Sequence, residues 1–216
     1  MIFEIDNTEL YFEGKQILNG IYLKAETGKI TGILGANGCG KSSLLKIIFG
    51  SLKPRHKLIR IDKKAYLKPL FLLGMVKYLP QHNIFPKDIK IGTAFKFYEV
   101  SWKDFQQDFP QLPIQIWQKV GELSGGETRI FETYLTLKSD SKIVLLDEPF
   151  THLSPLYIEK FIEMIRQESK NKAILLTDHM YRHILDLADD IYLLQNACSK
   201  LINKTSDLED YHYLRP

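Results

Sequence analysis

The sequence has few cysteines and lacks any long apolar run, and each shortage argues against a class of protein. Its 216 residues include 2 cysteines, which do not make the disulfide framework of a small secreted domain and suit a reducing compartment. No stretch approaches about 18 uninterrupted apolar residues, so we expect no helix that spans a bilayer. The opening MIFEID has no basic segment before an apolar core, so no secretory signal is apparent. We therefore expect a cytoplasmic location.

Internal repeats, low-complexity tracts and Pro/Ser-rich linkers are also absent. Hydrophobic residues make up 44% and charged residues 25% of the chain, values typical of globular domains that bury a real core. We expect residues 1–216 to form one domain, because alternating strand and helix patterns predict a single α/β sheet protein. The expected antiparallel peripheral strands are residues 2–5 and 17–23, and the expected parallel core strands are residues 30–34, 75–79, 143–146 and 173–177.

The most informative feature is the segment at residues 35–42, which reads GANGCGKS. It matches G-x-x-x-x-G-K-S, the phosphate-binding loop pattern, between an apolar run at residues 30–34 and a helical pattern at 43–49. Its glycines let backbone N–H groups turn toward phosphates at a helix N-terminus. Lys41 can reach the β- and γ-phosphates, and the Ser42 hydroxyl can ligate Mg²⁺. The segment predicts nucleotide binding.

A second motif, LSGGE at residues 123–127, comes before a helical pattern at 128–137. Ser124 and Glu127 have the capping-box spacing, so one interpretation is simply a well-capped helix. The two glycines favour a second interpretation, since they remove side chains from the helix start and let an anion approach the backbone. One chain has no evident use for two such sites around one ATP, whereas a two-fold dimer has.

Together the two motifs resemble the ATP-binding subunit of an ABC transporter, over about residues 12–194. LSGG is close to diagnostic for that superfamily. The resemblance implies a P-loop NTPase (RecA-like) α/β fold: a parallel sheet core, an N-terminal antiparallel β subdomain and an inserted helical lobe at about residues 82–138. It further implies ATP hydrolysis with Mg²⁺, a homodimer that sandwiches ATP, and a separate transmembrane permease subunit. We expect a peripheral position on the inner face of the cell membrane and no nucleic-acid partner.

Two adjacent acids follow the buried-strand pattern at residues 143–146. Ligands of parallel sheets bind beyond the carboxyl ends of the strands, where Asp147 and Glu148 fall. In the family, the residue matching Asp147 holds Mg²⁺, often through water. The residue matching Glu148 activates the water that attacks the γ-phosphate.

Three further residues match the family by position. Gln81, in KYLPQ, matches the glutamine that ligates Mg²⁺ or water, and His179, after an apolar strand, matches the histidine that contacts the γ-phosphate. Phe12 matches the aromatic residue that stacks on adenine; Tyr11 is the alternative, and a core position for Phe12 is another. The resemblance thus assigns catalysis to Glu148, His179 and Gln81, metal binding to Ser42, Gln81 and Asp147, and nucleotide binding to Phe12, Gly35, Asn37, Gly38, Cys39, Gly40, Lys41, Ser42, Ser43, Ser124, Gly125 and Gly126.

Two segments depart from the family pattern. Ser154 stands where an aspartate usually precedes the proline, so communication between the two ATP sites is in doubt while the hydrolytic set is complete. The segment after residues 191–194 lacks the glycine turn that is common there.

Two compositional features leave alternatives open. A basic run at residues 53–68 fits anionic lipid headgroups or nucleic-acid phosphates, but a solvated face on a peripheral strand and loop is the favoured interpretation. Aromatic residues are dense between residues 81 and 121, either as the core of a small lobe or, where exposed, as a docking patch. The basic residues are Lys53, Arg55, Lys57, Arg60, Lys63, Lys64 and Lys68, and the aromatic ones are Phe85, Phe95, Phe97, Tyr98, Trp102, Phe105, Phe109 and Trp117.

Other functions remain as alternatives to a transporter subunit. One is a soluble ABC ATPase of DNA, ribosomes or iron–sulfur assembly. Paired domains, a coiled-coil insertion or a zinc-ligand cysteine cluster would indicate some of these proteins; the sequence has none of them, which leaves a single-domain assembly ATPase open. The other is a weakly catalytic nucleotide sensor, supported by Ser154 and opposed by Glu148 and His179. Residues 146–150 and 177–179 resemble branched-chain amino-acid and lipopolysaccharide-export ATPases, so importer and exporter both stay open.

Overall fold

Two sheets organise the molecule, which a computed structural model describes at residues 1–178, 181–204, 206–211 and 213. The larger sheet has the order β10-β9-β3-β8-β7-β6. All its strands except β10 run parallel to one another. β10 pairs antiparallel with β9 at the other edge. The strands are β3 (Ile30–Leu34), β6 (Val76–Leu79), β7 (Ile143–Asp147), β8 (Ala173–Thr177), β9 (Asp190–Gln195) and β10 (Cys198–Ile202).

The smaller sheet is antiparallel, with the order β2-β1-β4-β5. Its strands are β1 (Ile2–Phe12), β2 (Lys15–Glu26), β4 (His56–Ile61) and β5 (Lys64–Tyr66). The sequence predicted the first two but ended the first at Ile5, because Asp6 and Asn7 break the apolar alternation. The strand continues because a register shift between Ile5 and Thr8 and a positive φ of 47° at Asn7 absorb the polar pair.

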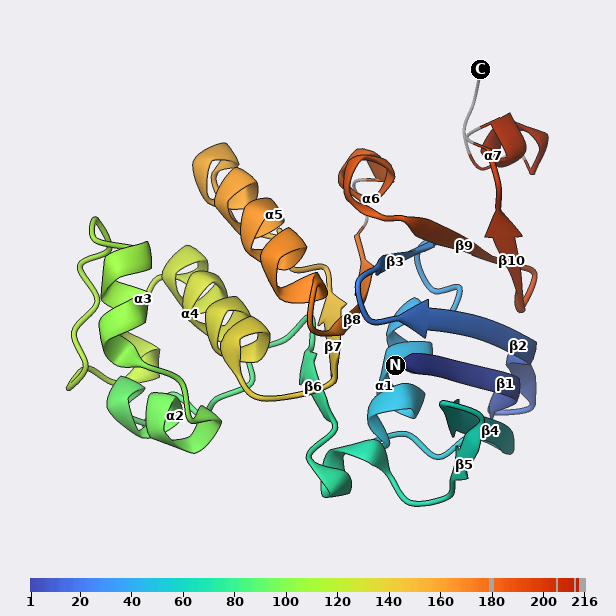
Figure 1. The fold of residues 1–216 in the computed structure, drawn as a ribbon, viewed down its shortest axis with the longest axis horizontal. Coiled ribbons are helices and arrows are strands. Elements are labelled where there is room, and N and C mark those ends of the chain that lie inside the picture. Colours follow the sequence, from blue (N-terminus) through green and yellow to red (C-terminus); the bar gives the residue numbers. More distant parts are fainter. Residues whose placement is uncertain (179–180, 205, 212, 214–216) are drawn as a thin grey trace.

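The central strands β3, β7 and β8 of the six-stranded sheet are buried on both faces, which explains the apolar runs that predicted them. Ile143 and Leu145 pack into a core with α1 (Lys41–Phe49) and the antiparallel sheet. Val144 and Leu146 pack into a second core with the helices of the other face. The core strands are thus confirmed, and Figure 1 shows the antiparallel sheet and the helical layer on opposite sides of them.

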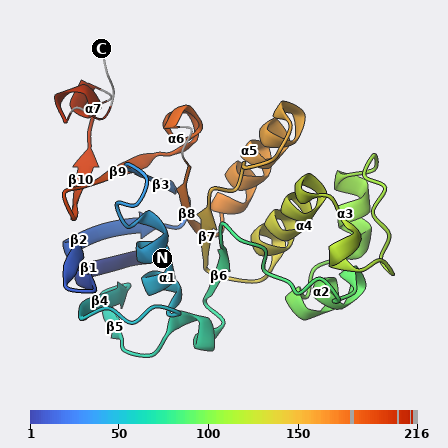
Figure 2. The same ribbon diagram turned by 180° about the vertical axis from the view of Figure 1, so that it is seen from behind.

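Four helices of the second core, α2, α3, α4 and α5, gather at the end of the molecule away from the antiparallel sheet (Figure 2). Most of the dense aromatic residues are core here, as in the T-shaped pair of Phe105 and Tyr134 with ring centroids 5.0 Å apart. Phe97 and Trp117 are the exceptions, at 76% and 67% exposure. The helical elements of the chain after α1 are η1 (Leu70–Leu73), α2 (Ile91–Tyr98), α3 (Trp102–Asp108), η2 (Val120–Glu122), α4 (Gly125–Lys138), α5 (Pro155–Ser169), α6 (Tyr181–Leu187) and α7 (Ser206–Asp210).

The basic run lies on β4, β5 and the segments beside them, and it is not a uniform free patch. Arg60 pairs with Glu4 at 3.4 Å and with Asp6 at 3.1 Å. Lys57 donates to the carbonyl oxygen of Ile47, and partial burial lowers its pKa. No helix among residues 1–178, 181–204, 206–211 and 213 is long and apolar enough to cross a membrane.

Candidate active site

The glycine-rich loop joins β3 to α1, which begins at Lys41, two residues earlier than the periodicity indicated. A Cβ atom on Gly35, with φ 154°, would lie 2.6 Å from both Cys39 Sγ and the Leu194 carbonyl oxygen. On Gly40, with φ 108°, it would lie 2.8 Å from Leu18 Cδ2. Both positions therefore require glycine. Gly40 is also the N-cap, and having no side chain it leaves the first-turn N–H groups of α1 to an anion.

The side chain of Lys41 folds back over this loop. Its buried ammonium donates to the carbonyl oxygens of Gly35 (2.6 Å) and Ala36 (3.1 Å). Burial raises the pKa of the neighbouring Cys39 thiol, with Lys41 opposing the shift. The thiol therefore stays neutral, and the loop presents a positive charge and N–H dipoles, which suit phosphate.

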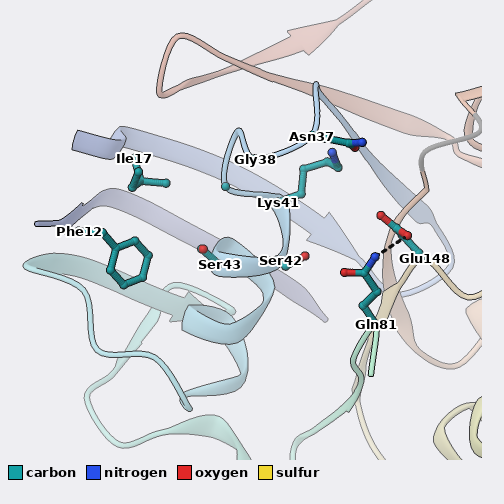
Figure 3. Close-up of a pocket in the computed structure, with 10 residues that line it drawn as sticks. Phe12, Ile17, Asn37, Gly38, Lys41, Ser42, Ser43, Gln81 and Glu148 are labelled. Atoms are coloured by element: carbon teal, nitrogen blue, oxygen red, sulfur yellow. Dashed lines mark hydrogen bonds between the residues drawn. The ribbon is translucent and has the colours of Figure 1, made fainter. Parts of the chain in front are cut away.

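A cavity of about 450 Å³ runs from the loop to the ends of two strands (Figure 3). Phe12 and Ile17 form one end, and Gln81 and Glu148 lie at the other. Phe12 is 47% exposed, so the alternative that it belongs to the core is wrong. The remaining lining residues are Asn37, Gly38, Gly40, Lys41, Ser42 and Ser43.

Gln81 and Glu148 come together from neighbouring strands. Gln81 follows β6 and Glu148 follows β7, and these strands pair in parallel, so both side chains emerge at the same sheet edge. The Gln81 Nε2 donates to the Glu148 Oε2 at 3.0 Å. This contact uses the amide nitrogen, and in Figure 3 the amide oxygen of Gln81 points to the side of Ser42.

The backbone of Glu148 is held in a conformation that side chains rarely adopt. Its φ is 51°, and left-handed non-glycine residues cost about 1–3 kcal/mol and cluster at active sites. Three contacts fix it: its N–H donates to the Thr177 carbonyl oxygen (3.0 Å) and to Thr177 Oγ1 (3.3 Å), and its carbonyl accepts from Arg129 Nη2 (2.7 Å). These contacts hold the backbone from which the Glu148 carboxylate projects toward Gln81.

Asp147 is buried one residue earlier and accepts two hydroxyl hydrogen bonds. Thr177 Oγ1 donates to its Oδ1 at 2.8 Å, and the Tyr78 hydroxyl donates to its Oδ2 at 3.0 Å. Burial, together with the charge of Asp147, raises the pKa of Tyr78, so the phenol remains a donor. The carboxylate is therefore fixed in one orientation.

The residues expected to hold Mg²⁺ fit that ion. Ser42 and Gln81 line the cavity, and Asp147 is adjacent to Glu148, which lines it too. They supply only hard oxygen donors with one carboxylate, which is the set Mg²⁺ takes when it keeps waters and binds through phosphates. No cluster of three or more His, Cys, Asp or Glu side chains occurs in the described part of the chain to suggest an all-protein metal cage.

Sequence reasoning missed two buried charges on α4, of which Arg129 contacts the backbone of the site and Glu132 contacts the segment that follows Gln81. Arg129 donates to the carbonyl oxygens of Pro80 (2.7 Å) and Asp147 (2.6 Å), in addition to that of Glu148. Glu132 accepts from the N–H groups of Ile84 (2.7 Å) and Phe85 (3.3 Å). Burial lowers the pKa of Arg129 and raises that of Glu132. The sequence did contain a signal for them: Arg129 and Glu132 fall among the apolar residues of the predicted helix, and a charged side chain is buried only where it has partners.

The LSGGE segment forms the start of α4, and the predicted capping box is confirmed. Glu127 N–H donates to Ser124 Oγ (3.3 Å), and Ser124 N–H donates to Glu127 Oε2 (2.8 Å). The helix consequently begins at Gly125 instead of residue 128. Ser124, Gly125 and Gly126 are not among the described residues that line the nucleotide-sized cavity. Gly125 instead lines a neighbouring cavity of about 550 Å³ with Arg129, and Gln81 lines both cavities.

Two other segments singled out in the sequence, both within the described residues, do not line the nucleotide-sized cavity. Ser154 is the exposed N-cap of α5, and its side chain makes no capping hydrogen bond. The turn between β9 and β10 uses Asn196 and Ala197 at positive φ in place of glycine. His179 lies outside the described residues.

Comparison with known proteins identifies relatives of the whole chain. A family model described as ABC transporter matches residues 18–151. The chain is 27% identical to the high-affinity branched-chain amino acid transport ATP-binding protein BraG of Pseudomonas aeruginosa, over 91% of this chain and 90% of that protein. It is 31% identical to an uncharacterized ABC transporter ATP-binding protein of Methanocaldococcus jannaschii, over 91% and 84%. A solved ATP-binding subunit of an ABC transporter shares the fold, with a TM-score of 0.84 at 20% identity, over 100% of this chain and 95% of that one.

Proposed function

The chain belongs to the ABC transporter family, and from this premise we propose how its residues perform the ATP hydrolysis of a transporter subunit. Subunits of this kind bind and hydrolyse ATP and work with membrane transporter components. We take residues 1–216 as one ATPase domain, with the helical lobe at about residues 82–138. The observation that carries the proposal is the single cavity that the glycine-rich loop shares with Gln81 and Glu148.

The loop and Lys41 bind the phosphates, and Phe12 provides a π-face for the adenine at the other end of the cavity. The N–H groups of α1 point at the phosphate chain, and Lys41 exchanges its two carbonyl contacts for phosphate oxygens. Most catalysis of phosphoryl transfer comes from this positioning and charge neutralisation.

Glu148 accepts a proton from the attacking water, and Gln81 orients the Glu148 carboxylate through its amide nitrogen. Ser42, Gln81 and Asp147 would hold Mg²⁺, which when bound neutralises charge on the phosphate oxygens. His179 would contact the γ-phosphate, as in the family. The strained backbone of Glu148 supports this assignment, since such strain persists where surrounding contacts enforce it.

A second copy of the chain completes each site by supplying Ser124, Gly125 and Gly126 to its partner's nucleotide. Two facts support this homodimer. The start of α4 is a second glycine-rich helix N-terminus, and it is exposed at Ser124 and Gly125, away from the chain's own nucleotide cavity. Hydrolysis then separates the two chains.

The membrane partner is a transmembrane permease subunit that docks on the helical lobe. Exposed Phe97 and Trp117 support this assignment, because exposed aromatic residues are enriched at interfaces. This places the chain at the inner face of the cell membrane, in the cytoplasm. Arg60 pairs with Glu4 and Asp6, which reduces the positive charge that the basic run could offer to nucleic-acid phosphates. We therefore propose a protein partner and no nucleic-acid partner.

Mixing two inactive variants tests the shared site. Ser124→Arg blocks the γ-phosphate contact given to the partner, and Lys41→Ala removes phosphate binding in its own chain. Each homodimer should be inactive. In a mixture, the heterodimer has one site with both defects and one with neither, so ATPase activity should partly return.

A doubly substituted chain provides the control for this experiment. This chain carries both Lys41→Ala and Ser124→Arg. When it pairs with either single variant, neither of the two ATP sites is intact, so both mixtures should stay inactive. Wild-type turnover by isolated Ser124→Arg chains would contradict the shared site, since the motif would then only cap α4.

A further inference from the structure

The buried side chain of Arg129 reaches from α4 to the ends of two strands of the larger sheet. Its Nη1 donates to the carbonyl oxygen of Pro80 at 2.7 Å, just after β6. Its Nη2 donates to the carbonyl oxygens of Asp147 (2.6 Å) and Glu148 (2.7 Å) at the end of β7. One guanidinium group thus joins the backbone after β6 to the backbone at the end of β7.

These three carbonyls flank the two side chains that meet at the end of the nucleotide cavity. The Pro80 carbonyl belongs to the peptide group before Gln81, and the other two belong to the peptide groups on either side of the Glu148 Cα atom. A guanidinium suits this arrangement because it is planar and presents several N–H donors in a fixed geometry. Arg129 therefore constrains the separation at which Gln81 Nε2 meets Glu148 Oε2, which is 3.0 Å (Figure 3).

We infer that Arg129 is a positioning residue for ATP hydrolysis, which holds Glu148 and Gln81 in the relative position that the reaction requires. The inference rests on the proposed role of Glu148 as the acceptor of a proton from water. The φ of Glu148 is 51°, and a relaxed backbone would take a negative φ that points the carboxylate elsewhere. Arg129 opposes this relaxation because it binds the carbonyl oxygens on both sides of the Glu148 Cα atom.

A second buried cation, at the other end of α4, makes the same kind of contact away from the site. Lys172 donates to the carbonyl oxygens of Leu137 and Ser139, the latter at 3.0 Å. Loss of either cation leaves backbone carbonyls without a donor, which costs stability. Loss of Lys172 should not move Glu148, so Lys172 provides the matched control for Arg129.

Arg129→Met tests the inference, because it removes the donors and keeps a long unbranched side chain. The single-turnover rate of ATP hydrolysis should fall by about 10²-fold. Affinity for a non-hydrolysable ATP analogue should be preserved, since the phosphate-binding loop is not altered. Arg129→Lys keeps a cation without the planar fork and should lose less of the rate. Lys172→Met should lower stability in urea and leave the hydrolysis rate unchanged.

A double-mutant cycle shows whether Arg129 acts through Glu148. In the Glu148→Gln background the proton acceptor is absent, so Arg129→Met should lower the remaining rate much less than it does in the unmodified chain. A further loss of the full size in that background would overturn the inference, because Arg129 would then act independently of Glu148.

Mixed dimers assign the effect to one chain of a shared site. When Ser124→Arg and Lys41→Ala chains pair, the intact site uses Glu148 of the Ser124→Arg chain and the start of α4 from the Lys41→Ala chain. Arg129→Met added to the Ser124→Arg chain should remove most of the recovered activity. Added to the Lys41→Ala chain, it should leave that activity unchanged. Equal losses from the two placements would overturn the positioning role.

The remaining outcomes separate this inference from the proposed function. Loss of analogue binding together with hydrolysis in Arg129→Met would limit Arg129 to a role in folding and overturn the inference. Without recovery in the parental mixture, the shared site is wrong, and the comparison of Arg129→Met with Lys172→Met still decides the role of Arg129. Normal turnover in Glu148→Gln would instead contradict the proposed function itself.

Discussion

The two glycine-rich helix starts of this chain differ in what occupies their N–H groups. At α1 the N-cap is Gly40 in the left-handed region, the first turn has no acidic residue, and the loop opens on a cavity. At α4 the N-cap is Ser124, which with Glu127 forms a complete capping box. The first start is left for a ligand, whereas at the second the N–H groups of Ser124 and Glu127 already have partners in their own chain.

The N–H groups at a helix N-terminus can bind an anionic ligand or be capped by side chains of the same chain, and α1 and α4 differ in this respect. An uncapped start such as that of α1 leaves orphan donors, which an anion satisfies. The start of α4 has lost one donor to Ser124 and gains a carboxylate at Glu127, which reduces its attraction for anions. Gly125 and Gly126 still permit close approach, so α4 suits a weaker contact added to phosphates that α1 already holds.

The largest expected effect comes from matched Glu→Gln changes beside the two helix starts. Glu148→Gln keeps shape but removes the proton acceptor, and should slow ATP hydrolysis by about 10²–10⁴-fold with ATP affinity preserved. Glu127→Gln should leave the rate near that of the unmodified chain, because glutamine also completes a capping box. Single-turnover hydrolysis and nucleotide binding measure both variants.

Two results would reverse this comparison. Normal turnover in Glu148→Gln would remove that residue from catalysis. A rate loss in Glu127→Gln as large as that in Glu148→Gln would mean that the capping carboxylate takes part in the chemistry, and the capped start of α4 would no longer be the passive one.

Sequence reasoning succeeded where short segments determine the structure. The strands at residues 30–34 and 143–146 are buried on both faces, so their positions are apolar apart from Thr31 and Gly32, and the pattern is clear. The capping box of Ser124 and Glu127 spans four residues and was predicted for the same reason. The resemblance named Gln81 and Glu148 as site residues, and the structure brings both to the cavity lined by residues 37–38 and 40–43 because β6 and β7 pair in parallel and end at one edge.

The missed contacts depend on packing between distant segments. Arg129 reaches carbonyls of residues 80, 147 and 148, which no local pattern encodes. Tyr78 looks in sequence like an ordinary strand residue, and only the pairing of β6 with β7 brings its hydroxyl to Asp147. The polar pair Asp6 and Asn7 hid the second half of β1, because a bulge there depends on the partner strands.

An intermediate effect is expected from Gly→Ala changes at the two starts. Gly40→Ala forces a side chain into a left-handed conformation 2.8 Å from Leu18 and should lower the free energy of unfolding by about 2–4 kcal/mol. Gly125→Ala meets nothing within 4 Å and should leave stability nearly unchanged. Urea denaturation of each chain measures the difference.

Nucleotide affinity provides a second readout for the same pair. Gly40→Ala distorts the phosphate-binding loop, so ATP at 100 times the wild-type Kd should no longer add about 2.7 kcal/mol of stability. Gly125→Ala should keep that increment in the monomeric chain, since Gly125 does not line the cavity of the loop. Equal losses from both substitutions would place the two helix starts in one intrachain site.

The smallest expected effect is the loss of stability when the side-chain cap of α4 is removed, because α1 has no such cap. Ser124→Ala removes the acceptor for the Glu127 N–H and should lower the free energy of unfolding by about 1 kcal/mol, while Ser124→Asp should restore it. Ser43 occupies the third helical position of α1, where the cap is Gly40 and no side chain serves as acceptor, so Ser43→Ala should not lower stability. Urea titrations of the three variants compare these values. An equal loss from Ser43→Ala would show that α1 also depends on a side-chain contact, and that its N–H groups are not kept for a ligand.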